Sequence, residues 1–263
     1  DEFIDCAKII NLNNMNCGMP QIYSTFMVQM DVPLYKEDLS ATNLMSAGAV
    51  SAYTYWTDFY TKYGFPKTYD FFNRFRTGLM PMGIADFSVY ATIKAAAPEI
   101  NGKWMMYELP GFEQEDGSIN NAVTGSGTAC VILNWSQKQD KAWEFLKWWT
   151  SASTQTSFGY EMESLQGEAG RVPTANLEAF ENLAWKASDM EALLTQYSFV
   201  RGIPQVPGGY YSWRNVNNAF YTVTTDTDTA SPREELMDKV VLINSELAYK
   251  WEEFELTKSE GGE

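Results

Sequence analysis

The stretch Gly125–Gln155, GSGTACVILNWSQKQDKAWEFLKWWTSASTQ, decides how the rest of the sequence is interpreted. Its apolar run, Thr128–Leu133, has the length and the β-branched content of a fully buried strand, and it leads directly into an apolar helix. Ser136 and Gln139 have the spacing of a capping box, so we expect the helix to begin just after Ser136. A strand followed by a helix is half of an α/β unit.

The expected helix carries a wider apolar arc than an ordinary surface helix. Its apolar stripe consists of Ala142, Phe145, Leu146 and Trp149, with Trp143 and Trp148 beside it. Apolar residues at helical spacing usually belong to a core, so we expect this helix to be covered on more than one side.

The composition indicates a globular chain of one large or two ordinary domains. The 263 residues include 15% aromatic and 20% charged residues, and no apolar run approaches the length of a membrane span. The formal net charge of -15 argues against nucleic acid and anionic membranes as partners, because both are bound through clustered Lys and Arg.

The chain has no histidine, which excludes Ser/His/Asp and Cys/His catalysis and every His-dependent metal site. Cys6, Cys17 and Cys130 form no C-x-x-C pair, and we interpret them as small buried hydrophobes, with a Cys6–Cys17 disulfide as the alternative. No cofactor is expected.

Several segments have helical patterns with identifiable ends. Residues 1–11 read as a helix, whereas the aromatic segment Gln21–Met30 fits a helix or a strand. Ser46 is expected to cap a helix that ends at Gly64. Further helices are expected at 158–165, at 176–185, and from Ser231, with Pro232 at the first helical position.

Asp86 follows a short apolar strand and stands at the expected start of a helix that runs to about Ala97. It is either a helix cap or a ligand contact, because open α/β sheets bind ligands where a helix begins after a strand. Phe87 and Tyr90 lie in the same first turn.

Two further segments have weaker patterns. Trp104–Leu109 is a candidate strand closed by Pro110-Gly111. The acidic loop Glu113–Gly117 lacks the alternate-residue spacing of a calcium loop, so we expect a solvated turn, with metal binding as the minor alternative.

The helix expected from Gly209 onward places aromatic and charged side chains away from its core face. Trp213, Val216, Ala219, Phe220 and Val223 share the core face. Tyr210 and Arg214 are four residues apart on a different face, with Tyr211 beside them. Aromatic planes with fixed donors suit a sugar, although an exposed Tyr/Arg pair without a ligand explains the pattern equally well.

Three sequence blocks occur in an order that resembles the order in a known protein family. They are Phe75-x-x-Gly78-x-Met80-Pro81-Met82-Gly83-Ile84, then Leu109-Pro110-Gly111, then Ala142–Trp149 closing at Gln155. In this order and spacing they resemble bacterial extracellular solute-binding proteins of the carbohydrate type, the receptor subunits of ABC importers. The resemblance covers essentially the whole chain.

The resemblance implies an α/β, periplasmic-binding-protein-like fold of type II, with two lobes around a solute cleft. It implies a carbohydrate ligand, delivery to a membrane permease, and an extracellular or periplasmic location as a lipoprotein. It implies no catalysis. By position it assigns ligand contacts to Tyr23, Phe26, Asp86, Phe87, Tyr90, Tyr210, Tyr211 and Arg214.

Family members begin with a lobe that precedes the helix at 1–11, so the resemblance implies a fragment. By the family's layout, residues 1–124 and 201–257 build the second lobe, residues 125–200 return to the first, and residues 258–263 are a polar tail. We expect the returning segment to expose apolar surface or to cover it against another chain.

Two other functions compete with a solute receptor. A carbohydrate-active enzyme needs two facing carboxylates, and Glu161 and Glu163, two residues apart on a helix, do not face one another. A sugar-sensing module for a membrane kinase would share the receptor's fold.

Overall fold

The computed structural model describes residues 2–20, 22–125, 127–171, 173–226 and 230–254. The described chain is mostly helical, and its strands are two or three residues long. It forms two compact units, which are called unit 1 and unit 2 below. Unit 1 comprises residues 1–68, 109–125 and 199–263, and unit 2 comprises residues 69–108 and 126–198.

The described residues of unit 1 form five α-helices and five strands of two or three residues. They are α1 (Glu2–Leu12), β1 (Cys17–Gly18), α2 (Tyr23–Gln29), α3 (Ala47–Thr61), β3 (Phe112–Glu113), β4 (Ile119–Asn120), β5 (Val123–Gly125), β6 (Val200–Gly202), α10 (Gly209–Thr225) and α11 (Pro232–Glu253).

The described secondary structure of unit 2 consists of helices and one two-residue strand. Its elements are α4 (Phe71–Arg76), β2 (Met82–Gly83), α5 (Ser88–Ala96), a 3-10 turn (Pro98–Ile100), α6 (Gln139–Trp149), α7 (Ala152–Gln166), a second 3-10 turn (Gly167–Gly170), α8 (Leu177–Asn182) and α9 (Ala187–Ser198).

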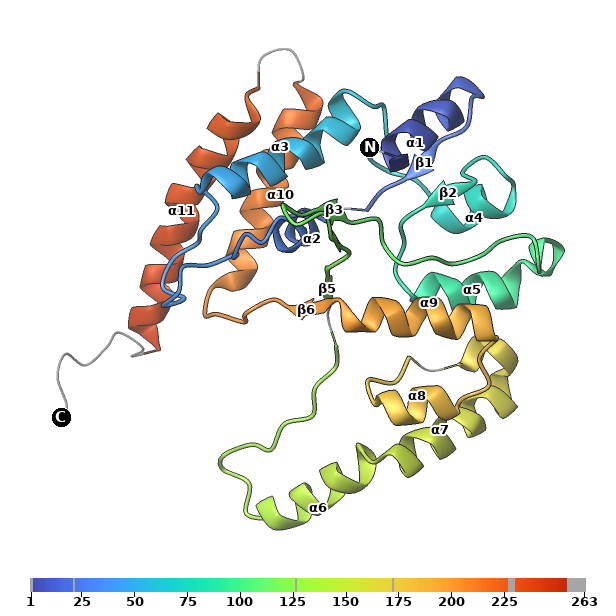
Figure 1. Ribbon diagram of the computed structural model, residues 1–263. Helices are drawn as coiled ribbons and strands as arrows, with labels where there is room; N and C mark the ends of the chain where they lie inside the picture. The colour runs from blue at the N-terminus through green and yellow to red at the C-terminus, as the bar shows by residue number, and fades with distance from the viewer. Residues whose placement is uncertain (1, 21, 126, 172, 227–229, 255–263) are drawn as a thin grey trace. The chain divides into compact units, whose positions relative to one another are not determined.

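An aromatic core holds unit 1 together around α3, which packs against α2, α10 and α11 (Figure 1). Trp56 of α3 is fully buried, and its ring stacks on Phe220 of α10 with centroids 4.2 Å apart. Phe59, one turn further along α3, stacks on Phe26 of α2 at 5.7 Å. These rings bury large apolar areas, so α3 is the element on which the other helices of unit 1 are placed.

Two helix starts have the side-chain caps that the sequence predicts, at Ser46 and Ser231, and Asn176 caps a third. Ser46 accepts a hydrogen bond from the Ala49 amide at 3.2 Å, and Asn176 accepts one from the Ala179 amide at 2.9 Å. Ser231 caps α11, whose residues Leu236, Val240, Ile243 and Leu247 are buried as expected. A cap satisfies an amide that has no partner within its helix, which fixes where each helix begins.

Strand pairing in unit 1 connects segments that are distant in the sequence. β5 pairs with β6 in parallel, so that Gly125 lies opposite Gly202. A Cβ atom at Gly125 would lie 2.5 Å from Cγ1 of Val200, so only glycine allows this approach. β3 pairs with β4 as an antiparallel hairpin around the acidic loop, which is therefore a turn, as predicted.

The prediction of strands at Thr128–Leu133 and Trp104–Leu109 is wrong. Neither range is a strand in the described structure, and Val131 is 76% and Tyr107 75% exposed. A strand needs a neighbour that accepts its backbone hydrogen bonds, and local β-propensity does not supply one.

The prediction of a covered core helix at α6 is also wrong. The helix begins at Gln139 and has no side-chain cap, while Ser136 accepts a hydrogen bond from the Lys138 amide before the helix starts. None of its residues is buried, and Trp143 and Trp148 are each 56% exposed. Helical periodicity reports which residues share a face, but it does not show that another element covers that face.

The cysteines do not form the alternative Cys6–Cys17 disulfide. All three are free, with Cys17 buried and Cys6 and Cys130 exposed. Burial raises the pKa of the Cys17 thiol to about 12. The prediction that cysteines are buried therefore holds for Cys17 alone.

No helix within the described ranges is both long enough and apolar enough to cross a bilayer. The predicted polar tail at 258–263 lies outside the described residues.

Replacing Phe220 with alanine tests the aromatic core. We expect Phe220→Ala to lower the free energy of unfolding by about 3–5 kcal/mol, because it leaves a cavity against Trp56. Phe254→Ala removes the same side chain from a position that is 60% exposed, and it should cost less than about 1 kcal/mol. Urea unfolding followed by circular dichroism compares the two, and equal losses would contradict this account of the core.

The exposed face of α6 predicts binding of an apolar dye. Wild-type protein should enhance the fluorescence of anilinonaphthalene sulfonate, and the double substitution Trp143→Gln/Trp148→Gln should reduce that enhancement. Leu12→Gln changes an apolar residue of α1 that is 84% exposed and lies outside α6, so it should have little effect. Wild-type protein without dye enhancement would show that the face is covered in solution.

Candidate functional site

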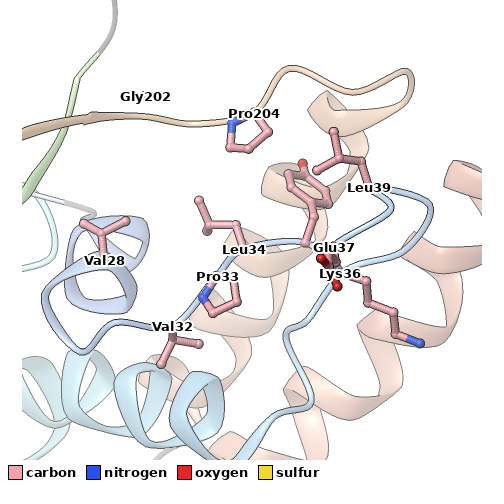
Figure 2. Close-up of a pocket in the computed structure, with 10 residues that line it drawn as sticks. Val28, Val32, Pro33, Leu34, Lys36, Glu37, Leu39, Gly202 and Pro204 are labelled. Atoms are coloured by element: carbon pink, nitrogen blue, oxygen red, sulfur yellow. The ribbon is translucent and has the colours of Figure 1, made fainter.

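A pocket of about 270 Å3 lies in unit 1 between the segment that follows α2 and the segment that follows β6 (Figure 2). Its walls are mainly apolar, and the exposed residues Lys36 and Glu37 add one charge of each sign. The residues that line it include Val28, Val32, Leu34, Tyr35 and Pro204. An apolar hollow with few polar groups is the usual form of a small-molecule site.

Two hydrogen bonds anchor the loop that forms one wall of this pocket. The amide and the hydroxyl of Thr42 both donate to Oδ1 of Asn244 on α11 at 2.9 Å. Across the loop, Asn43 donates its amide to the Leu34 carbonyl at 3.0 Å. The loop is therefore tied to α11, although Asn244 is 202 residues away in the sequence.

The pocket wall reaches the start of α10. The Tyr35 side chain is buried, and its hydroxyl lies 3.2 Å from where a Cβ atom at Gly209 would stand. Burial raises the pKa of Tyr35. Gly208, with a φ of 81°, lets the chain turn into α10 at this point. The pocket and the first turn of α10 are thus parts of one surface of unit 1.

The first turn of α10 presents the side chains that the sequence places away from the core. Tyr210 is 58% exposed, and the Arg214 guanidinium carbon lies 5.8 Å from the centre of its ring. Tyr210 donates a long hydrogen bond, 3.4 Å, to Glu246 of α11. Tyr211 is half-buried. The opposite face of α10 is buried through Val216, Ala219, Phe220 and Val223, as predicted.

Tyr23 and Phe26 do not have the open ring faces that a ligand contact needs. Tyr23 is 3% exposed and stacks on Trp56, while its hydroxyl donates to the Ala49 carbonyl at 3.0 Å. Phe26 is 6% exposed and is stacked on Phe59. Both lie on a short helix that packs against α3, so their rings belong to the core of unit 1, and their ligand role stays a prediction. Within the ambiguous segment, residues Tyr23–Gln29 form the helix α2, because their aromatic side chains pack against α3.

The start of α5 differs from the sequence prediction in how the helix is capped. The N-terminal cap of α5 is Phe87, and no side chain caps the helix, so Asp86 is not the predicted cap. Asp86 is exposed and Phe87 is half-buried. Tyr90 is buried, and its hydroxyl donates to Oδ2 of Asp189 at 2.8 Å. Burial, together with this bond to Asp189, raises the pKa of Tyr90, so the phenol stays protonated.

A buried ionic network beneath α5 has no counterpart in the sequence prediction. Arg171 donates from Nη2 and Nε to the two oxygens of Glu163, at 2.5 and 3.3 Å. Burial alone lowers the pKa of a guanidinium, but the hydrogen bonds and charge of Glu163 outweigh this effect, and the pKa of Arg171 is raised. Lys94 lies 3.9 Å from both Glu168 and Asp189. Charges scattered over four elements leave no local pattern that a sequence reading could detect.

Two carboxylates that the sequence singles out, Asp116 and Glu163, make contacts with neighbouring side chains. Within the described residues no group of three or more acidic or cysteine side chains could hold a metal ion. In the acidic loop, Asp116 accepts from the amide and the hydroxyl of Ser118 at 2.9 and 2.6 Å, which stabilises the turn. Glu163 is already paired with Arg171, so it is not free to act with Glu161.

Residues 1–164 match the sequence model of the bacterial extracellular solute-binding protein family. The chain belongs to this family. A search of curated proteins found no match.

Solved structures of sugar-binding receptors have a similar fold. An ABC transporter solute-binding protein from Thermotoga lettingae, bound with α-D-tagatose, has a TM-score of 0.71 at 21% identity over 94% of this chain and 64% of its own. The sugar-binding protein MalE from Xanthomonas citri has a TM-score of 0.73 at 18% identity, over 94% and 61%. The maltose-binding protein MalE from Listeria monocytogenes, in complex with maltose, has a TM-score of 0.67 at 19% identity, over 90% and 62%.

The chain therefore spans somewhat over three fifths of the length of these structures. At these identities the likeness establishes the fold, which is the periplasmic-binding-protein-like α/β fold expected from the sequence.

The anchored pocket wall can be tested through Asn244. We expect Asn244→Ala to speed amide hydrogen exchange in residues 36–43 by roughly tenfold, because Thr42 loses its acceptor. Asn244→Asp retains an acceptor oxygen and should keep exchange near the wild-type rate. If both variants exchange at the wild-type rate, these hydrogen bonds do not hold the loop.

Proposed function

We propose that this chain is the larger part of an extracellular solute receptor that binds a carbohydrate for an ABC importer. The family membership of residues 1–164, together with a fold shared with sugar-bound receptors over at least 90% of the chain, is the observation that carries this proposal. Its partner would be the importer's membrane permease. Its place would be outside the cytoplasmic membrane, held there as a lipoprotein.

We assign ligand contacts to two separate groups of side chains, and each group is a candidate sugar-binding surface of its own unit. In unit 1 they are Tyr210, Tyr211 and Arg214 at the start of α10. In unit 2 they are Asp86 and Phe87 at the start of α5. Rings stack on the C–H faces of a sugar, while the carboxylate of Asp86 and the guanidinium of Arg214 bond hydroxyls of the ligand. The exposure of Tyr210 and Asp86 and the half-exposure of Phe87 support this assignment.

Tyr23 and Phe26 are left out of the proposed site, because their rings already pack on Trp56 and Phe59. Catalysis is not part of the proposal. The proteins of this family are solute-binding proteins.

The proposal predicts sugar-dependent stabilisation. A ligand that binds only the folded protein adds about 2.7 kcal/mol at a concentration of 100 times its Kd, and the melting temperature rises accordingly. We expect such a shift with at least one sugar among α-D-tagatose, maltose and maltotriose. Release of glucose from the oligosaccharides by purified protein would instead favour an enzyme.

The assigned contacts predict a loss of affinity on substitution. Tyr210→Ala should weaken binding of the stabilising sugar by roughly tenfold, since an aromatic contact contributes about 1 kcal/mol or more. Tyr107→Ala removes a tyrosine that is 75% exposed and lies outside both groups, so it should bind like wild type. Isothermal titration calorimetry provides the Kd values, and equal affinities would remove Tyr210 from the site.

A further inference from the structure

The N-terminal part of α5 is fixed by side chains from elements more than 60 residues away in the sequence. The Tyr90 hydroxyl donates to Asp189 of α9 at 2.8 Å and lies 3.5 Å from Nη1 of Arg171. One turn later, Lys94 lies 3.9 Å from Asp189 and from Glu168. The chain thus brings residues 69–108 and 126–198 of unit 2 together through charged groups.

These charges are buried, so their energies depend on one another. The side chains of Arg171, Asp189 and Lys94 are 5%, 9% and 13% exposed. A buried charge is costly unless it is paired and hydrogen-bonded, and losing one partner leaves the other charge uncompensated. If α5 moves away, Asp189 loses both Tyr90 and Lys94. Displacement of α5 is therefore opposed by more than the loss of apolar contact.

The network is continuous with the proposed ligand turn through aromatic stacking. The ring of Tyr90 stacks on Phe87 with centroids 5.6 Å apart and planes 12° apart. Phe87 also meets the edge of Trp185 at 5.7 Å, and the Arg171 guanidinium lies 5.3 Å over Trp185. Fixing Tyr90 and Trp185 thus fixes two sides of the Phe87 ring.

We infer that Tyr90, Asp189 and Arg171 are positioning residues that hold Phe87 and Asp86 in place for the ligand. This inference rests on the proposed function. Tyr90 makes no ligand contact, because its hydroxyl is used by Asp189 and its ring face by Phe87. A ligand that meets a turn already held in place loses less conformational entropy on binding, so the network raises affinity without touching the ligand.

Tyr90→Phe tests the inference, because it removes only the hydroxyl and retains the ring stack. We expect amide exchange in residues 84–96 to increase by about tenfold, the effect of losing one hydrogen bond to a buried charged group. Exchange in α10 and α11 should stay unchanged. The matched control is Tyr160→Phe, which removes a hydroxyl bonded to the Asn182 carbonyl at 2.6 Å in the same unit.

Asp189→Asn provides a second variant of similar shape that removes the charge. If Tyr90 and Asp189 act together, the double variant Tyr90→Phe/Asp189→Asn should exchange less rapidly than the product of the two single effects predicts. The inference would be overturned if Tyr90→Phe had the same exchange pattern as Tyr160→Phe. It would also be overturned if the increases in exchange rate of the two single variants simply multiplied in the double variant.

The Kd values for maltose and α-D-tagatose then show whether the positioning role or the proposed function itself fails. We expect Tyr90→Phe to raise the Kd of the bound sugar several-fold. The melting temperature of this variant should stay close to that of Tyr160→Phe. An unchanged Kd together with faster exchange would show that the network holds α5 but does not serve binding. If wild-type protein binds neither sugar, the proposed ligand class fails, and the exchange results alone decide whether the network fixes the turn.

Discussion

The stack of Trp56 on Phe220 is the interaction on which the arrangement of unit 1 depends. It joins α3 to α10 at a centroid distance of 4.2 Å within a fully buried core. Because one face of α10 is held in this way, its first turn must present Tyr210 and Arg214 outward. The hydrogen bonds from Thr42 to Asn244 then fix the pocket wall against α11.

Unit 2 is stabilised in a different way. Apolar burial is modest along α6, and charged groups beneath α5 provide the specific contacts between distant segments. Such a network stabilises only the arrangement in which every charge has its partner. Unit 1 is thus held mainly by aromatic packing, whereas the α5 turn of unit 2 combines stacking of Tyr90 on Phe87 with paired charges.

Much of the helical structure could be predicted, since it depends on local chemistry. The caps at Ser46 and Ser231 and the buried stripe of α11 need no knowledge of the remaining chain. The strand predictions at Thr128–Leu133 and Trp104–Leu109 failed because pairing requires a neighbour. Of the predicted site, Tyr210, Arg214, Asp86 and Phe87 have accessible surface, whereas Tyr23, Phe26 and Tyr90 are buried by partners that are distant in the sequence.

The sequence by itself determined the family, the starts of α3 and α11 and the faces of α10 and α11, because motif order, capping and periodicity are properties of neighbouring residues. Only the tertiary structure decided which aromatic rings are core and which are accessible. It alone revealed the network of Arg171, Asp189 and Tyr90. Burial and charge pairing arise from contacts between segments that are far apart along the chain, and no local pattern records them.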